Sequence, residues 1–198
     1  GTVFQKLQDL GKLPLPNQDE SFENSKLTSK ILNNSGYLRY EISNYSLPRH
    51  QSRHNRVYWK GLGWWSFGQG STSSPWGIRF SRPKNIDEYQ KWVIDQCDKQ
   101  LDKSLIVNSV KRLDLDEKIM LGLRTKEGIN LKNLFIEEGW DENNSKKFMS
   151  KLLTSWQKYR DYDLLLNEGD RFFLSDPEGM ELSNQIIIDM FNWWDQIN

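Results

Sequence analysis

Cysteine is almost absent from this sequence of 198 residues, since Cys97 is the single one. One cysteine cannot form a disulfide framework within the chain. It also cannot supply the several thiolates that an iron–sulfur cluster or a thiolate-based zinc site needs. Long apolar runs are missing too: no stretch approaches the ~18 apolar residues of a membrane-spanning helix, and the first residues do not resemble a signal peptide. These absences predict a cytoplasmic protein without a transmembrane segment.

The chain carries no net charge, because 27 Lys and Arg balance 27 Asp and Glu. This balance hides a division, since residues 1–99 have 14 basic and 9 acidic residues, and residues 100–198 have 13 and 18. Aromatic residues are abundant, at 13% with nine Trp, which excludes a disordered chain. We therefore predict two domains, residues 1–99 and residues 100–198.

The first half mixes patterns of both kinds of secondary structure. The expected elements are a loop or extended arm (1–17), a helix (20–34), a strand (37–45), an irregular stretch (46–63), a short buried strand (64–67), a strand (78–80) and a helix (86–97). A short linker, residues 98–104, is expected to follow.

The second half predicts helices, a hairpin and a closing helix, which is a winged-helix-like order. The expected elements are helices at 114–123, 131–138 and 141–159, strands at 163–166 and 171–174, and a helix at 177–194. A winged helix suggests DNA binding, but DNA binding depends on Lys and Arg that neutralise phosphates, and this half is acidic. We therefore expect a packing or interaction module and no nucleic-acid partner.

The strongest candidate site is the segment 49–60, which contains both histidines of the chain among basic and aromatic residues. A histidine can bind haem iron, arginines can bind carboxylates, and Tyr and Trp offer flat apolar faces. An anionic tetrapyrrole needs this combination. Two other interpretations stay open: the arginines can form ordinary ion pairs beside a hydrogen-bonded loop histidine, and interleaved basic and aromatic residues also bind single-stranded RNA.

A second candidate is the glycine-containing segment 67–73, in which Gly68 and Gly70 allow positive φ or close approach of a ligand. It matches neither a phosphate-binding loop nor a dinucleotide fingerprint, so a tight turn is the competing interpretation. No arrangement typical of nucleophilic or metal-dependent hydrolysis is present, and we predict no catalytic residues.

Ordered motifs run through nearly the whole chain: Gly1-Thr2-Val3-Phe4, Leu13-Pro14-Leu15-Pro16, Gly36-Tyr37, Tyr40-Glu41-Ile42-Ser43-Asn44-Tyr45, Arg53-His54-Asn55, Tyr58-Trp59, Phe67-Gly68-Gln69-Gly70, Met120-Leu121-Gly122-Leu123-Arg124 and Glu127-Gly128-Ile129. Together they resemble the oxygen-independent coproporphyrinogen III oxidase-like radical S-adenosylmethionine proteins, with the nearest similarity to the haem-chaperone branch. The resemblance implies an α+β chain: strands and helices from the C-terminal edge of a partial barrel, then a small winged-helix-like domain.

The resemblance also implies which residues bind which groups. The family's His-Asn-x-x-Tyr-Trp segment, implicated in haem binding, corresponds to His54, Asn55, Tyr58 and Trp59, with His54 as the iron ligand. Arg53 and Arg56 flank these residues as candidate partners for haem or porphyrin carboxylates. Gly68 and Gly70 are expected near S-adenosylmethionine in the intact protein.

One departure from the family pattern limits the expected activity. The family's 4Fe–4S cluster and S-adenosylmethionine belong to an N-terminal barrel with a CxxxCxxC motif, which this chain lacks. We therefore expect the C-terminal portion of a haem-chaperone-type protein, inactive alone, with the barrel and a haem-acceptor protein as partners. The alternatives are a fragment of a true oxidase that decarboxylates coproporphyrinogen and a scaffold that binds no ligand.

Overall fold

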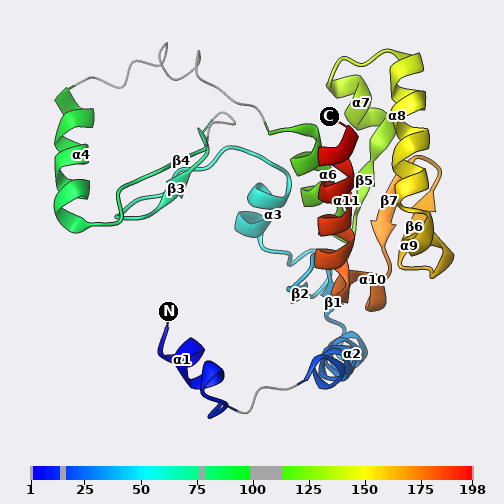
Figure 1. The fold of residues 1–198 in the computed structure, drawn as a ribbon, viewed down its shortest axis with the longest axis horizontal. Helices are drawn as coiled ribbons and strands as arrows, with labels where there is room; N and C mark the ends of the chain where they lie inside the picture. Colours follow the sequence, from blue (N-terminus) through cyan, green and yellow to red (C-terminus); the bar gives the residue numbers. More distant parts are fainter. Residues whose placement is uncertain (1, 14–16, 76–78, 99–112, 198) are drawn as a thin grey trace.

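The computed structural model describes residues 2–13, 17–75, 79–98 and 113–197 (Figure 1). The helices in chain order are α1 (Val3–Asp9), α2 (Gln18–Asn34), α3 (Arg53–Trp59), α4 (Ile86–Asp98), α6 (Leu115–Leu123), α7 (Leu131–Glu137), α8 (Glu142–Ser155), α9 (Gln157–Asp161), α10 (Glu178–Glu181) and α11 (Ser183–Ile197). The strands are β1 (Leu38–Arg39), β2 (Tyr45–Ser46), β3 (Thr72–Ser73), β4 (Phe80–Ser81), β5 (Ile129–Asn130), β6 (Leu165–Glu168) and β7 (Arg171–Leu174). The predicted α+β class is confirmed.

The hydrophobic core lies in residues 113–197, which we call the C-terminal module. Its antiparallel sheet has the order β5-β7-β6, with Ile129 opposite Phe172 and Leu165 opposite Leu174. The helices α6 and α10 pack on β7 of this sheet, α11 packs on α6 and α10, and α7 packs on α8. The buried side chains of the cluster are Ile119, Leu123, Leu131, Leu134, Phe135, Leu152, Trp156, Tyr159, Leu165, Phe172, Leu174, Met180, Ile186 and Met190.

Glycine is required at one position beside the sheet. Gly128 has φ +68°, and a Cβ there would lie 2.1 Å from the carbonyl oxygen of Phe172. No side chain fits into that distance, and positive φ is itself unfavourable for residues with a Cβ. This glycine therefore lets the chain enter β5 in contact with β7.

The first half of the chain has little core of its own. Among its described residues, Tyr40 is the single buried hydrophobic side chain, while Phe4 and Phe67 are 69% and 84% exposed. Its strands form two separate pairs, β1 with β2 and β3 with β4. Figure 1 shows residues 64–75 and 79–98, which we call the arm, extending away from the C-terminal module, with α1 and α2 apart from the arm. In the described residues, no helix has the length and apolarity to span a membrane.

A buried arginine attaches β1 and β2 to the C-terminal module. The side chain of Arg39 is 2% exposed, and its guanidinium lies 3.0 Å from Asp176 Oδ1 and 2.9 Å from Glu181 Oε1. Two backbone hydrogen bonds support this contact, because Ile42 N–H donates to the carbonyl of Arg124 and Lys126 N–H donates to that of Tyr40. Residues 38–46 are thereby part of the surface of the C-terminal module.

Most predicted elements of the second half are confirmed, with shifted boundaries. The expected helix at 141–159 divides into α8 and α9 at Trp156, and the expected helix at 177–194 divides into α10 and α11. The predicted linker, residues 98–104, lies almost entirely outside the described residues. The division at residue 99 stays a prediction.

Several predictions for the first half are wrong. Residues 1–17 contain α1, whose N-cap Thr2 accepts a hydrogen bond from Gln5 N–H. Residues 37–45 do not form one strand: the chain turns back so that Arg39 pairs with Tyr45, while Glu41 pairs with Thr125 of the C-terminal module.

Two further predictions concern residues 46–67. The stretch 46–63 is not irregular, because it contains α3. The buried strand at 64–67 is absent: Trp64 makes one bridge to Ser74, and Phe67 is exposed because no described element covers it. A short apolar run predicts a buried strand only where neighbouring elements cover it.

Candidate functional site

The candidate site is built on α3, a seven-residue helix that begins after Ser52. The Ser52 hydroxyl accepts a hydrogen bond from Asn55 N–H at 3.2 Å, which satisfies one of the free donors at the helix start. The helix ends before Gly61, whose φ of +61° reverses the chain direction. This cap places the predicted haem-binding segment on a regular element and fixes which side chains share a face.

His54 and Tyr58 share one face of α3, because residues four apart in a helix are neighbours. Their Nε2 and Oη atoms lie 3.2 Å apart, and the rings meet edge to face with centroids 4.9 Å apart. His54 is exposed to solvent and Tyr58 is half-buried. The predicted iron ligand His54 and the predicted haem-binding residue Tyr58 thus form a hydrogen-bonded pair.

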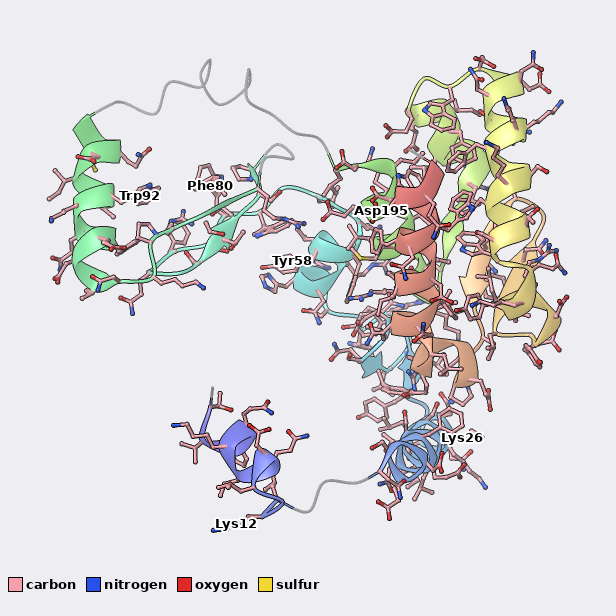
Figure 2. All side chains as sticks on the ribbon, in the orientation of Figure 1. Lys12, Lys26, Tyr58, Phe80, Trp92 and Asp195 are labelled. Atoms are coloured by element: carbon pink, nitrogen blue, oxygen red, sulfur yellow. The ribbon has the colours of Figure 1, made fainter. Side chains whose placement is uncertain are left out.

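The phenol ring of Tyr58 is held from its other side by the arm. Its centroid lies 4.7 Å from the ring of Trp64, and Figure 2 shows Tyr58 on the side of α3 turned toward the arm. Trp64 is itself fixed, because its Nε1–H donates to the carbonyl of Thr72 at 3.2 Å and its backbone pairs with Ser74. The result is a continuous contact from His54 through Tyr58 to Trp64.

An ion pair joins this aromatic contact to the C-terminal module. The guanidinium of Arg79 lies 5.9 Å from the Trp64 ring centroid and 2.8 Å from Glu117 Oε1 on α6. Sequence analysis did not identify Trp64 or Arg79 as part of the site. The one sequence feature that could have identified Trp64 was its position shortly after Tyr58 and Trp59. No feature of the sequence indicated that Arg79 contributes to the site.

The opposite face of α3 contacts the C-terminal module. Asn55 donates from Nδ2 to Tyr40 Oη at 3.4 Å, and Arg56 lies 3.1 Å from Glu127 Oε1. Trp59 lines a pocket of about 540 Å³ between α3 and the C-terminal module, together with Tyr40 and Arg56. Asn55 and Arg56 therefore hold the helix in place on the side away from His54, where Trp59 faces the pocket.

The predicted site residues thus divide into two groups. His54 and Tyr58 lie on the outer face, and Asn55, Arg56 and Trp59 lie on the inner face. Arg53 is exposed at the helix start. The other histidine, His50, is exposed in the turn before the helix, and no ring contact with Tyr58 is formed there.

Gly68 and Gly70 lie in a turn of the arm rather than on α3. Their φ angles are +93° and +67°, and Gly70 N–H donates to the carbonyl of Pro83 at 2.8 Å. The turn stands at the end of the β3–β4 pair that continues into α4. Both glycines have positive φ, which is one of the two roles that the sequence left open for them.

A cluster of ionisable residues lies away from α3, between α9 and α11. Asp189 accepts hydrogen bonds from Lys158, from Tyr159 Oη at 2.5 Å and from Gln185 at 2.8 Å. The hydrogen bond from Lys158, followed by that from Tyr159, lowers the pKa of Asp189. Burial, followed by the hydrogen bond to Asp189, raises the pKa of Tyr159. The cluster fastens two helices and faces no pocket of the site.

The donors for a metal ion are limited. Among the described residues, no group of three or more His, Cys, Asp or Glu side chains is arranged to hold a metal ion, and Cys97 is exposed on α4. A metal that is already held by four equatorial nitrogens, as in haem, needs only one or two protein ligands. The exposed His54 imidazole fits that requirement.

Several curated proteins similar to this chain are named heme chaperone HemW. The chain is 31% identical over 96% of its length to the protein named heme chaperone HemW of Synechocystis sp., and 29% identical over 93% to that of Lactococcus lactis. It covers 48% and 46% of those proteins, so it spans about half the length of the curated relatives it matches. No family model matches the chain.

A solved structure has the same fold. The structure described as coproporphyrinogen III oxidase (HemN) of Escherichia coli, a radical SAM enzyme, superposes with a TM-score of 0.59 at 13% identity. The match covers 89% of this chain and 42% of that one. The resemblance that the motifs indicated is thus confirmed: homologues of the chain in Synechocystis sp. and Lactococcus lactis are the proteins named heme chaperone HemW, and its fold matches part of a radical SAM enzyme.

Proposed function

We propose that this chain is the C-terminal portion of a haem-chaperone-type protein and binds haem or a related porphyrin through α3. The observation that carries the proposal is the exposed imidazole of His54 on a capped helix, hydrogen-bonded to Tyr58 at 3.2 Å. An exposed imidazole can reach the iron of a planar macrocycle without displacing other side chains. The name of the curated relatives supports the same ligand class.

The remaining predicted residues receive separate roles in this proposal. Arg53, exposed beside His54, is a partner for a haem carboxylate, as an arginine fork can be. Arg56 is paired with Glu127, so it is a partner for a carboxylate only when that ion pair opens. Asn55 holds α3 through its hydrogen bond to Tyr40, and Trp59 lines the pocket beside α3.

The cofactors of radical chemistry are assigned elsewhere in this proposal. With Cys97 as its single cysteine, the chain has no thiolate set for a 4Fe–4S cluster. We place the cluster and S-adenosylmethionine in the N-terminal barrel that the family resemblance implies, with Gly68 and Gly70 near the latter. The chain by itself then performs no radical reaction. The exposed apolar side chains of residues 2–98, including Phe4 and Phe67, fit a surface that packs against that barrel.

The C-terminal module has a separate proposed role. Its order of a helix, a strand, the helices α7 and α8 with the short α9, and a hairpin resembles that of a winged helix, and we propose this fold type for it. The acidic balance of residues 100–198 favours a protein partner, such as a haem acceptor, over nucleic acid. We propose that haem binding by this chain takes place in the cytoplasm.

A titration of the chain with ferric haem, followed by the Soret absorbance, tests the proposal. We expect a saturable one-to-one spectral shift. His54→Ala should raise the dissociation constant at least about tenfold, or ~1.4 kcal/mol of binding free energy. His50→Ala is the matched control, because both histidines are exposed and four residues apart; it should change the constant by less than about twofold.

Two results would contradict this proposal. Equal effects of the two substitutions would remove His54 as the specific ligand. No saturable shift in the unmodified chain would leave a scaffold that binds no haem alone. Decarboxylation of coproporphyrinogen by a protein that contains both this chain and the barrel would instead favour the oxidase alternative.

A further inference from the structure

A groove of about 880 Å³ lies between α7 and α8 of the C-terminal module, two helices that pack side by side (Figure 1). Its α8 wall is one stripe of that helix, with positions three or four residues apart: Glu142, Ser145, Lys146, Met149, Leu153 and Thr154. Residues at this spacing share one helix face. From its first to its last residue the stripe extends ~18 Å, which is also the length of a second helix of ~12 residues.

The lining of this groove is largely apolar. Phe135 is fully buried, and Trp140 stacks on it with the ring centroids 5.2 Å apart. Met149 and Leu153 are half-buried on the α8 wall, whereas Ile136 on the α7 wall is 63% exposed. An apolar surface that is open to solvent and bordered by polar residues is typical of a site where another protein surface packs.

Lysines dominate the charge of α7 and α8 around the groove. They are Lys132 of α7 and Lys146, Lys147 and Lys151 of α8. Among the described residues, only Lys146 forms an ion pair, with Glu142 at 2.6 Å, and an exposed pair of this kind contributes little. Helix α8 thus has three lysines and one acidic residue, although residues 100–198 have 13 basic and 18 acidic residues. This local excess of positive charge complements an acidic partner.

We propose that the α7–α8 groove binds an amphipathic helix of a partner protein, whose apolar face enters the groove and whose flanking residues are acidic. A helix that lays its apolar face into an apolar groove is a common mode of peptide recognition. Nucleic acid fits this surface less well, because a phosphate backbone offers no apolar face to Ile136, Met149 and Leu153. The inference deepens one part of the proposed function, the protein partner of the C-terminal module, and does not depend on haem binding by α3.

Two synthetic helical peptides and the whole chain, without haem, test this proposal by fluorescence anisotropy of a label on the peptide. Each peptide has about 14 residues, with leucines at positions i, i+3, i+4 and i+7. One has glutamates on both flanks of the leucines, and the other has lysines. We expect saturable binding of the glutamate peptide and at least about tenfold weaker binding of the lysine peptide.

Two isoleucine variants locate the binding surface. Ile136→Glu should raise the dissociation constant of the glutamate peptide at least about tenfold, because it places a charge in the apolar lining. Ile188→Glu is the matched control, because Ile188 is 52% exposed on α11 and does not line the groove; it should change the constant by less than about twofold. Both positions are exposed, and circular dichroism checks that both variants keep the fold.

Reversing the charge of the lining tests the acidic character of the partner. The double variant Lys132→Glu with Lys146→Glu should weaken the glutamate peptide and strengthen the lysine peptide, since both lysines are exposed in the lining of the groove. Equal binding of the two peptides by the unmodified chain, or no exchange of preference in the double variant, would overturn the proposal.

Other results would also overturn it. These are the absence of saturable binding of the glutamate peptide and equal effects of Ile136→Glu and Ile188→Glu. Displacement of the bound peptide by duplex DNA would assign the surface to nucleic acid. A dimer in sedimentation equilibrium that Ile136→Glu converts to a monomer would assign the groove to a second copy of this chain. Each of these results leaves the proposed haem binding standing, because no haem is present.

Discussion

Replacing Arg39 with methionine tests how the first half of the chain is attached to the C-terminal module. Methionine keeps most of the apolar stem and removes the charge. The guanidinium is 2% exposed and makes close contacts to Asp176 and Glu181, whose side chains are 14% and 24% exposed. It also donates to the carbonyl of Ile42 at 3.0 Å.

The size of the loss follows from what the substitution leaves behind. Two carboxylates that are largely removed from water would lose their counter-ion, and breaking a buried ion pair in this way costs about 3–5 kcal/mol. Glu181 keeps some contact with solvent and can be partly rehydrated, which places the expected loss near the lower end, about 3 kcal/mol. That is a large share of the ~5–15 kcal/mol that stabilises a typical protein.

Urea unfolding followed by far-ultraviolet circular dichroism and by tryptophan fluorescence measures the loss. Arg53→Met is the matched control, because Arg53 is exposed; it should change the free energy of unfolding by less than about 0.5 kcal/mol. Adding Asp176→Asn and Glu181→Gln to Arg39→Met should recover part of the stability, because no unpaired charge then remains. A loss below about 1 kcal/mol for Arg39→Met, or no recovery in the triple variant, would refute this account of the attachment.

Two further predictions concern the C-terminal module. The pKa of Asp189 is lowered in the folded state by Lys158 and Tyr159, so its contribution to stability is present above the unfolded pKa and disappears as the pH falls through the folded pKa. Asp189→Asn should therefore lower the free energy of unfolding by about 1–2 kcal/mol at pH 7 and make it depend less on acid pH. Urea unfolding at pH 7 and at pH 2 measures this effect. Equal losses of stability at the two pH values would contradict this role of Asp189. Gly128→Ala should cost more than about 3 kcal/mol, since its Cβ would meet a carbonyl oxygen at 2.1 Å in addition to the positive φ. Gly139→Ala, with φ +74° and open space, isolates the φ effect at about 1 kcal/mol, and thermal melts in which the two variants match would refute the steric argument.

The elements of the C-terminal module could be predicted because its helices bury one face against a shared core. Apolar residues at helical spacing, such as Ile119 and Leu123, show that face directly in the sequence. The sequence did not show where the predicted long helices are interrupted. Helix α8 ends at Trp156 because this buried side chain belongs to the core while the chain turns into α9.

The first half was harder to predict because its elements are short and depend on distant residues. Arg39 and Glu41 are buried by the C-terminal module, so a pattern of alternating side chains did not show that the chain turns between β1 and β2. Helix α3 was missed because five of its seven residues, all except Arg53 and Arg56, are weak helix formers; the clearest local signal was Ser52, a favoured N-cap residue.

The candidate site was predictable in its residue types and not in its geometry. Which residues belong to the site followed from the clustering of histidines, arginines and aromatic residues in 49–60 and from the family motif. The separation of His54 from Trp59 onto different faces could not follow without knowing that the segment is helical. Trp64 approaches Tyr58 through the pairing of the arm, which no local pattern in the sequence encodes.

The concentration of buried side chains in the C-terminal module has a consequence for how the molecule opens. Amide hydrogens of α6 and α11, whose side chains fill the core, should exchange with deuterated solvent only when the whole module unfolds. The helices α1 and α4 contribute no side chain to this core, so their amides should exchange through local fluctuations. Helix α3 lies between these limits, because its protection depends on the contacts of Asn55 and Arg56 with the neighbouring surface. Its exchange rate is therefore a direct measure of how firmly the helix that carries His54 is held.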